Sequence, residues 1–343
     1  MTSRIRMALI VMLMAGWLGG CGGEQQGAPA TTAAPVRPAG LKIVMIAKNT
    51  TNPIFVSARK GADDAARALA EKHGMRIEIV WMTPDREDGE LQALAIAQAV
   101  RDRASAILIS CSDPARTTGA IDNAVERGVP VMTFDSDAAA SKRFAFYGVD
   151  DEKLGRTVMR ELAAQIRKNG PVAILAGNAD APNLRKRVEG VKKEAALYPG
   201  IQVVGTFNHA ETPADAAAEV ISAHAANRQI RGWAMVGGWA LFTPRLMKEL
   251  DPKKVTVVAV GALPGQLPFV ENGLAPVLLA LPTYNWGYVS IQRIVDKVHL
   301  KHDVPTIIPP MDVVRVTKDN LGSWARQLKD WGSIVPDHYL MLK

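Results

Sequence analysis

The sequence predicts an α/β protein with two doubly wound parallel sheets in two consecutive halves. From Leu41 onward, short apolar or β-branched runs alternate with longer segments of helical period, an order that is typical of parallel sheets. The same rhythm repeats through the second half of the chain, whose 343 residues suit about two domains. Ligands of such sheets bind beyond the carboxyl ends of the strands, so the expected site is a cleft between the halves.

The first half contains five predicted strands, each an apolar run bounded by polar or turn residues. A helix is predicted after Asn52, because Pro53 suits the first helical position and small or apolar residues follow at spacing four. Two further helices are predicted over 88–103 and 117–127. The strands are expected at 41–47, 76–82, 106–110, 129–134 and 144–148.

The second half repeats this plan without a long linker. Its predicted helices span about 151–168, 185–197, 213–227, 240–250 and 265–272. Its predicted strands span 172–176, 202–207, 232–236, 255–260 and 275–281.

The first 40 residues have the composition of an export signal and a tether. Arg4 and Arg6 precede an apolar run over 7–18 and small residues that end at Cys21, which is the layout of a secretory signal. The run is shorter than the ~20 residues that a membrane-spanning helix needs. The residues before Cys21 resemble the lipobox of bacterial lipoproteins, whose cysteine is acylated, and a plain cleaved signal is the alternative. We therefore predict a signal peptide over 1–20 and a lipidated Cys21 with a flexible tether over 21–40.

Composition and charge argue against several functional classes. The formal net charge of +7 is modest and its lysines and arginines form no extended run, which argues against nucleic-acid binding. With two cysteines, the chain cannot form a disulfide framework or a cysteine-rich zinc site. Cys111 lies in an apolar run and is expected in the core.

Motifs for catalysis are absent from the sequence. It contains no G-x-S-x-G nucleophile elbow, phosphate-binding P-loop, G-x-G-x-x-G turn or H-E-x-x-H zinc pair. His209 and Glu211 could form an acid–base pair, but no nucleophile accompanies them, and hydrogen bonding to a ligand or solvent is the alternative. His299 and His302 are expected at a helix end, where imidazoles suit the dipole better than a metal. We expect no enzymatic activity, metal or cofactor; an envelope enzyme is the alternative.

A polar triplet follows one of the predicted strands directly. Asp135, Ser136 and Asp137 come immediately after the apolar run 129–134. Carboxylates accept hydrogen bonds from vicinal hydroxyls, so the triplet suits a polyol ligand. A buried carboxylate needs a partner, and Arg187 on the opposite wall is the candidate. For each aspartate, capping the loop toward solvent is the alternative.

A set of short motifs follows in order between about residues 41 and 320. It comprises Asn52-Pro53-Ile54-Phe55 with Gly61-Ala62, the run 133–137, Gly148-Val149-Asp150, the run 185–190, and Pro282 with Gly287. In this order and spacing, the set resembles the type I periplasmic sugar-binding proteins of ribose-binding type. The resemblance implies two α/β lobes joined by a three-segment hinge, which close around a ligand and deliver it to an ABC importer.

The resemblance also implies a division of the chain and a set of partners. The first lobe would comprise 41–149 with 282–310, and the second 150–281 with 311–343. The protein would be a monomer in the periplasm or at the cell surface, anchored to the membrane by its lipid, with a small sugar-like ligand and an ABC transporter permease as partners. A sensor subunit for a chemoreceptor or histidine kinase, or a binder of a non-sugar solute, is the alternative. Repressors of the LacI type share these lobes but begin with a helix-turn-helix, whereas this chain has a signal and tether there.

The same resemblance assigns roles to individual residues. It implies that Asn52 and Phe55 hydrogen-bond and stack on a sugar, that Asp135 supplies a strand-end carboxylate, and that Arg187 binds hydroxyls. The candidate stacking platforms are Phe55, Trp81, Trp239, Tyr284 and Trp286. The full set of predicted ligand-binding residues is Asn52, Phe55, Asp135, Ser136, Asp137, Arg187, Glu211, Trp239 and Asn285.

Four departures distinguish this chain from the ribose-binding pattern. Ser136 stands in place of an arginine, and Ala280 in place of a glutamine. Gly237-Gly238 replaces Asn-Asp, and Val260-Gly261-Ala262 replaces Gly-Phe-Asp. The second lobe therefore offers fewer polar side chains than a pentose site needs. Trp239 and Glu211 could compensate; otherwise the ligand is less hydroxylated, with a furanosyl compound, a nucleoside and a methylated sugar all open.

Overall fold

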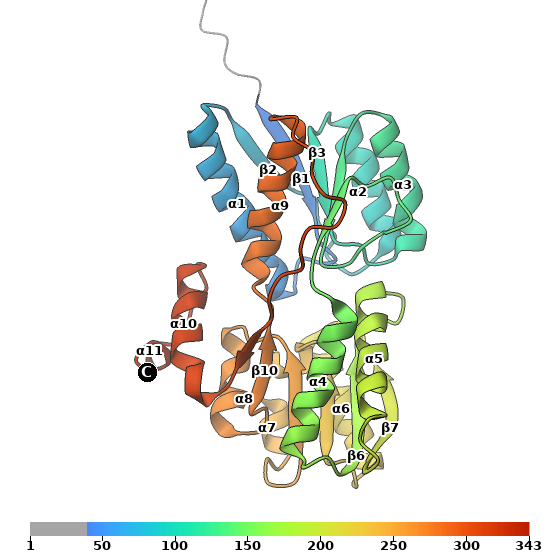
Figure 1. Ribbon diagram of the computed structural model, residues 1–343, viewed down its shortest axis with the longest axis vertical. Coiled ribbons are helices and arrows are strands. Elements are labelled where there is room, and N and C mark those ends of the chain that lie inside the picture. The colour runs from blue at the N-terminus through green and yellow to red at the C-terminus, as the bar shows by residue number, and fades with distance from the viewer. Residues whose placement is uncertain (1–39, 343) are drawn as a thin grey trace, which may run out of the picture. The chain divides into compact units, whose positions relative to one another are not determined.

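Two sheets organise the chain into two lobes (Figure 1). The computed structural model describes residues 40–342, so the predicted signal peptide, Cys21 and the tether up to residue 39 lie outside the described residues. The first sheet has the order β2-β1-β3-β4-β5, with β1 (Leu41–Ile46), β2 (Ile77–Trp81), β3 (Ala106–Ile109), β4 (Val131–Phe134) and β5 (Ala145–Tyr147). The second has the order β11-β10-β9-β8-β6-β7, with β6 (Gly170–Ala176), β7 (Ile201–Asn208), β8 (Gly232–Met235), β9 (Thr256–Val260), β10 (Val277–Ala280) and β11 (Val314–Val316).

The pairings within both sheets are parallel except at one edge. β11 pairs with β10 in the antiparallel sense, with Leu279 opposite Arg315. The predicted class, two parallel-sheet α/β lobes, is confirmed, and the antiparallel edge strand corrects the expectation that the second sheet is wholly parallel. No helix among residues 40–342 combines the length and the apolar character needed to cross a membrane.

The central strands of the first sheet, β1, β3 and β4, are buried on both faces, which explains their nearly continuous apolar runs. In β1, Ile43 and Met45 pack into one cluster with residues of α1 (Pro53–His73) and α9 (Thr283–Val298). The intervening Val44 and Ile46 face the opposite side, where they pack with α2 (Gly89–Arg101) and α3 (Pro114–Glu126). Cys111 is fully buried in that second cluster, and burial raises the pKa of its thiol to about 12.

Helices of the first lobe begin where the sequence places a capping side chain directly after a strand-end loop. Asn52 accepts a hydrogen bond from the Ile54 N–H, and Asp88 accepts from the first turn of α2. Asp113 caps α3 in the same way, and the helix begins at Pro114, three residues before the predicted start. Asn52 and Asp113 are each followed by a proline, whose fixed φ suits the first helical position.

The second sheet carries a longer set of helices. Residues 240–250, predicted as one helix, form a 3₁₀ turn (Trp239–Phe242) and a short α7 (Arg245–Glu249), because Pro244 cannot continue the first turn. The last two helices are α10 (Leu321–Asp330) and α11 (Asp337–Leu340), and the Tyr339 hydroxyl on α11 donates to Glu271 at 3.0 Å. The remaining elements are α4 (Asp151–Gln165), α5 (Pro182–Ala195), α6 (Pro213–Ala226), a 3₁₀ turn (Pro264–Gln266), α8 (Leu267–Asn272) and a 3₁₀ turn (Lys318–Asn320).

The chain passes between the sheets three times: from β5 to α4, from β10 to α9, and from α9 back to β11. After the second passage, α9 lies against α1, which precedes it by more than 200 residues in the sequence (Figure 1). Glycines set how closely the two helices approach. A Cβ at Gly61 would lie 2.0 Å from the Tyr284 carbonyl oxygen, and one at Gly287 would lie 1.8 Å from the Ala58 carbonyl oxygen. The α1–α9 contact therefore requires glycine at both positions.

Candidate functional site

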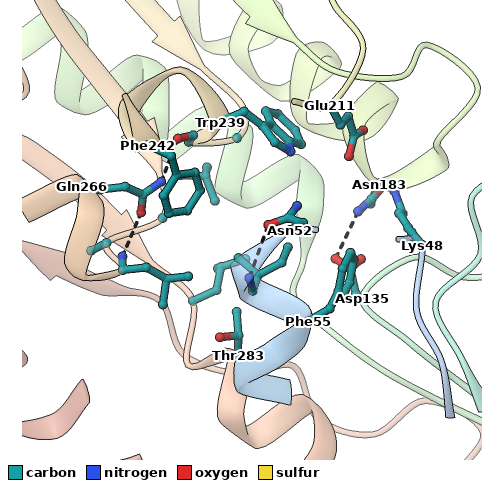
Figure 2. Close-up of a pocket in the computed structure, with 18 of the residues that line it drawn as sticks. Lys48, Asn52, Phe55, Asp135, Asn183, Glu211, Trp239, Phe242, Gln266 and Thr283 are labelled. Atoms are coloured by element: carbon teal, nitrogen blue, oxygen red, sulfur yellow. Dashed lines mark hydrogen bonds between the residues drawn. The ribbon is translucent and has the colours of Figure 1, made fainter. Parts of the chain in front are cut away.

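The carboxyl ends of strands from both sheets border one pocket, which we call the interlobe pocket (Figure 2). This is the place where the topology of open parallel sheets positions a ligand. The residues lining it include Lys48, Asn52, Ile54, Phe55, Asp135, Asn183, Leu184, Arg187, Glu211, Trp239, Phe242, Leu263, Gln266, Leu281, Thr283, Trp286 and Trp324.

Asp135 supplies a buried carboxylate at the end of β4. Its backbone has φ 56°, in the left-handed region that residues other than glycine seldom adopt, so the surrounding contacts must hold it there. The Ser110 hydroxyl donates to Oδ2 at 2.8 Å, and the Asn183 amide donates to Oδ1 at 3.2 Å. Ser110 belongs to the same lobe and Asn183 to α5 of the other lobe. The carboxylate is therefore fixed in the pocket and tied to both lobes.

Arg187 lies one helical turn after Asn183 on α5 and enters the pocket from the second lobe. Its Nε donates to Asp151 Oδ1 at 2.8 Å, and its Nη1 donates to the Val236 carbonyl at 3.1 Å. Its Nη2 is buried, has no hydrogen-bond partner among residues 40–342, and lies 3.9 Å from Asp135 Oδ1. The guanidinium is thus held by two bonds while one donor group remains directed toward the facing carboxylate.

Asp151 at the start of α4 is the counter-ion that positions Arg187. Both side chains are nearly fully buried, so each charge depends on the other for compensation. Burial raises the pKa of Asp151 to about 6, and the adjacent Arg187 opposes that rise.

Lys48, Glu87 and Glu211 form a charged cluster on the polar side of the pocket. Lys48 Nζ lies 3.7 Å from Glu87 Oε1, and it donates to Asn183 Oδ1 at 3.5 Å. Burial alone would lower the pKa of Lys48, but the carboxylates around it, Glu87 first, raise that pKa above its ordinary value. Burial and the Glu87 carboxylate raise the pKa of Glu211 to about 8, against the opposing charge of Lys48.

Asn178 joins the two glutamates across the lobes. Its side-chain amide donates to Glu87 Oε1 at 3.1 Å, and its backbone N–H donates to Glu211 Oε1 at 3.1 Å. Glu87 belongs to the loop after β2, whereas Asn178 and Glu211 belong to loops after β6 and β7. Together with the Asn183–Asp135 bond, these contacts join the lobes on the polar side of the pocket.

Aromatic side chains supply the apolar surface. Phe55 and Trp286 both pack against Phe134, with ring centroids 6.4 and 6.1 Å away. Trp239 packs edge-to-face on His209, with centroids 5.1 Å apart. Of the five candidate stacking platforms, these three (Phe55, Trp239 and Trp286) line the pocket.

The other two candidate platforms are placed elsewhere. Trp81 lies under the Arg59 guanidinium, 5.4 Å from the ring centroid. Tyr284 stacks on Tyr288 and Trp331 and donates its hydroxyl to Asp64 at 3.0 Å. Each ring has a structural partner outside the pocket lining.

Six of the nine predicted ligand-binding residues line the interlobe pocket, and binding by them stays a prediction. They are Asn52, Phe55, Asp135, Arg187, Glu211 and Trp239. Asn52 uses its Oδ1 to cap α1, and its amide nitrogen points into the pocket (Figure 2).

The other three predicted residues, Ser136, Asp137 and Asn285, do not line the pocket. Asp137 accepts from Arg143 Nη2 at 2.7 Å and from the Thr133 hydroxyl at 2.6 Å, so a neighbouring guanidinium compensates its charge within the first lobe. Ser136 is fully buried in the turn after β4, where its carbonyl accepts from the Cys111 N–H. Asn285 is half-buried in the first turn of α9.

Sequence reasoning missed four polar lining residues: Lys48, Asn183, Gln266 and Thr283. Lys48 and Asn183 lie in segments that follow a strand, where ligand-binding residues were expected. The signal was their position, but lysine and asparagine are mostly exposed in proteins, and nothing in the sequence marks these two as buried. Their burial results from the facing lobe.

Residues 40–342 contain no group of three His, Cys, Asp or Glu side chains arranged to hold a metal ion. His209 and Glu211, the possible acid–base pair, point to different partners: His209 packs on Trp239, and burial lowers the pKa of its imidazole. What the pocket offers is hydrogen bonding and stacking.

Residues 43–300 match the family described as periplasmic binding protein domain. The chain belongs to the periplasmic binding protein family. Among solved structures, this periplasmic binding protein is similar to an ABC transporter solute-binding protein from Burkholderia graminis in complex with D-arabinose, with TM-score 0.75, 27% identity, and coverage of 82% of this chain and 96% of that one. It shares its fold with a carbohydrate transporter solute-binding protein from Agrobacterium radiobacter, also in complex with D-arabinose, with TM-score 0.76, 22% identity, and coverage of 86% and 99%.

Curated relatives of this periplasmic binding protein match over a shorter stretch. The ribose import binding protein RbsB of Bacillus subtilis is 30% identical over 139 residues, which are 40% of this chain and 43% of the relative. A D-ribose/D-allose-binding protein of Pseudomonas aeruginosa is 25% identical over 170 residues, 48% of this chain and 52% of the relative. The chain thus spans about half the length of the curated relatives it matches.

Proposed function

We propose that this chain is an extracytoplasmic solute-binding protein that captures a small sugar-like ligand in the interlobe pocket and delivers it to an ABC importer. The observation that carries the proposal is the pairing of Arg187 Nη2 and the Asp135 carboxylate, 3.9 Å apart on facing lobes. A hydroxyl both donates and accepts, so a polyol between the lobes satisfies the arginine donor and the carboxylate acceptor together. Phe55 and Trp239 add the ring faces that suit the C–H surface of a sugar.

The charges in and beside the pocket disfavour an anionic ligand. Lys48 and Arg187 supply two positive charges against the three carboxylates of Asp135, Asp151 and Glu87, while the raised pKa of Glu211 keeps that side chain mainly protonated at neutral pH. An anionic ligand would add to this excess of negative charge, and burying an uncompensated charge is unfavourable. A neutral polyol avoids that penalty.

Ligand capture is proposed to work through lobe closure rather than catalysis. The polar groups converge from both lobes, so a ligand that bonds to Asp135 and Arg187 at once stabilises the closed state over the open one. A permease that recognises the closed state then receives only loaded protein. We propose that the protein acts as a monomer without enzymatic activity in the periplasm or at the cell surface, with the lobes divided at the chain crossings as predicted.

Thermal unfolding of the purified protein against a panel of solutes tests the binding role. Pentoses, hexoses, polyols, nucleosides and small non-sugar solutes are each added in excess. A ligand at 100 times its dissociation constant adds ~2.7 kcal/mol to the free energy of unfolding, so its midpoint rises clearly. A rise with sugars supports the proposal, and a rise with non-sugar solutes alone contradicts its sugar specificity.

The membrane anchor is proposed to be a lipid on Cys21, and a Cys21→Ser variant tests it. The variant lacks the acylated sulfur and is expected in the soluble fraction after cell disruption, whereas the parent protein stays with membranes. Cys111→Ser is the matched control, because that thiol is fully buried. Continued membrane association of the Cys21→Ser variant would contradict lipid anchoring at Cys21, and the proposed ligand binding would be unaffected.

A further inference from the structure

The interlobe pocket has an apolar end, formed where three strands of the second sheet finish. β8 is followed by Val236 and then by Gly237 and Gly238, β9 by Gly261 and Ala262, and β10 by Leu281. These positions lie where the sheet topology brings strand ends to a ligand, yet none presents a polar side chain. Phe242 lies at this end, away from Asp135 and Lys48 (Figure 2).

Two polar side chains at this end, Gln266 and Trp324, are already satisfied by the protein. Gln266 accepts from the Leu263 N–H at 2.8 Å and donates to the Gly238 carbonyl at 2.7 Å, so both ends of its amide are occupied (Figure 2). The Trp324 indole N–H donates to the Ala262 carbonyl at 2.6 Å. A ligand hydroxyl placed beside them would lose its bonds to water and find these groups engaged.

Close packing requires glycine at two of the positions that form this end of the pocket. A Cβ at Gly237 would lie 2.0 Å from the Trp239 ring, and one at Gly238 would lie 2.1 Å from Gln266 Nε2 and 2.8 Å from the Val260 carbonyl oxygen. A polar side chain at either glycine would displace Trp239 or Gln266. The apolar character is therefore built into the packing around the pocket.

We propose that the ligand is a sugar that carries an apolar substituent: its hydroxyls face Asp135, Arg187 and Asn52, and the substituent lies against Phe242, Ala262 and Leu281. This proposal rests on the proposed function and specifies its ligand class. An alkyl or aryl glycoside, or a deoxy sugar with a methyl group in place of a hydroxymethyl, has the required division into a hydroxylated and an apolar part. A fully hydroxylated sugar does not, because it buries a hydroxyl against hydrocarbon.

Calorimetric titration of the intact protein with matched sugars tests the proposal. The free sugars are D-ribose, D-arabinose and D-galactose; each is compared with its methyl glycoside, its phenyl glycoside, and the analogue deoxygenated at the terminal carbon. We expect at least one apolar analogue to bind ten times more tightly than its parent sugar. Equal or tighter binding of every parent sugar would overturn this proposal and leave sugar capture standing. If neither series bound, sugar capture itself would fail, and this proposal with it.

Variants at the apolar end provide a second test. Ala262→Asp puts a carboxylate there and is expected to shift the preference at least tenfold toward the parent sugar. Ala218→Asp is the matched control, because Ala218 is exposed on α6, and it should keep the preference of the parent protein. If Ala262→Asp does not fold, Phe242→Ala replaces it and should reduce the ratio of phenyl-glycoside to free-sugar affinity. A ratio unchanged in the folded variant would count against the apolar subsite.

Discussion

The two ends of the interlobe pocket occupy equivalent places in the topology but offer opposite chemistry. At the polar end, the residues after β1 and β4 and the start of α5 bring in Lys48, Asp135, Asn183 and Arg187. At the apolar end, β8 and β9 are followed by glycine and alanine. Both are strand ends of parallel sheets, so the fold fixes where a ligand lies, while the loops and helix starts that follow each strand decide what that ligand is.

The largest expected effect at the polar end is that of Arg187→Ala. It removes the donor that faces Asp135 and leaves Asp151 buried without its counter-ion, which costs about 3–5 kcal/mol of folding stability. Ligand affinity should fall at least tenfold in the protein that still folds. Calorimetric titration and denaturant unfolding measure the two effects, and Lys186→Ala, exposed on the same helix, is the control. Unchanged affinity would remove Arg187 from the binding site.

Asp135→Asn isolates the charge of the strand-end carboxylate. Asparagine tolerates the left-handed backbone at this position, so the fold should persist while ligand affinity falls by about tenfold, near 1.4 kcal/mol. The informative comparison is Asp137→Asn, two residues away, which breaks the pair with Arg143. That variant should lower the free energy of unfolding but change ligand affinity far less. Equal losses of affinity in the two variants would contradict the separation of these aspartates.

Gly238→Ala tests whether packing maintains the apolar end. The added Cβ collides with Gln266, and relieving such overpacking costs typically 1–3 kcal/mol. Gly119→Ala is the matched control: it lies inside α3, a Cβ there meets nothing within 4 Å, and alanine should stabilise the helix by roughly 0.5–1 kcal/mol. Chemical denaturation compares both with the parent, and opposite signs are expected.

The smallest expected effect is a pH dependence that arises from Glu211. Its folded pKa of about 8 lies above the ordinary value of 4.5, so the protonated form stabilises the fold, and that contribution is lost as pH rises through about 8. The unfolding midpoint should fall by a few degrees between pH 6 and 9. The charged groups that face this carboxyl are Glu87 and Lys48. Because Glu211→Gln removes the titrating group, it should flatten the dependence of the unfolding midpoint on pH. An identical fall in that variant would place the titration elsewhere.

Sequence reasoning predicted the sheets better than the site. The alternation of apolar runs and helical segments is a local property, and so are the caps at Asn52 and Asp113. The antiparallel β11 is three residues long, and its pairing with β10 depends on a distant segment. Local patterns could not reveal such a contact.

Within the site, the difference between Asp135 and Asp137 shows the same limit. Both follow the same strand, and the pattern predicted both as ligand-binding residues. Arg143, six residues further on, compensates Asp137, whereas Asp135 meets Asn183 from the facing lobe. Neither partner could be chosen from spacing alone, because each choice depends on how the loop turns and how the lobes meet.

The contact between α1 and α9 sets the order in which the molecule can be completed. The Tyr284 hydroxyl on α9 donates a hydrogen bond to Asp64 on α1, although 220 residues separate them. A side chain in place of Gly61 or Gly287 would collide with the facing helix. During synthesis, the first lobe therefore lacks one side of its core until nearly the whole second lobe has been made. Such long-range closure is slow. We expect the first lobe of a nascent chain to stay incompletely folded until α9 has been synthesised.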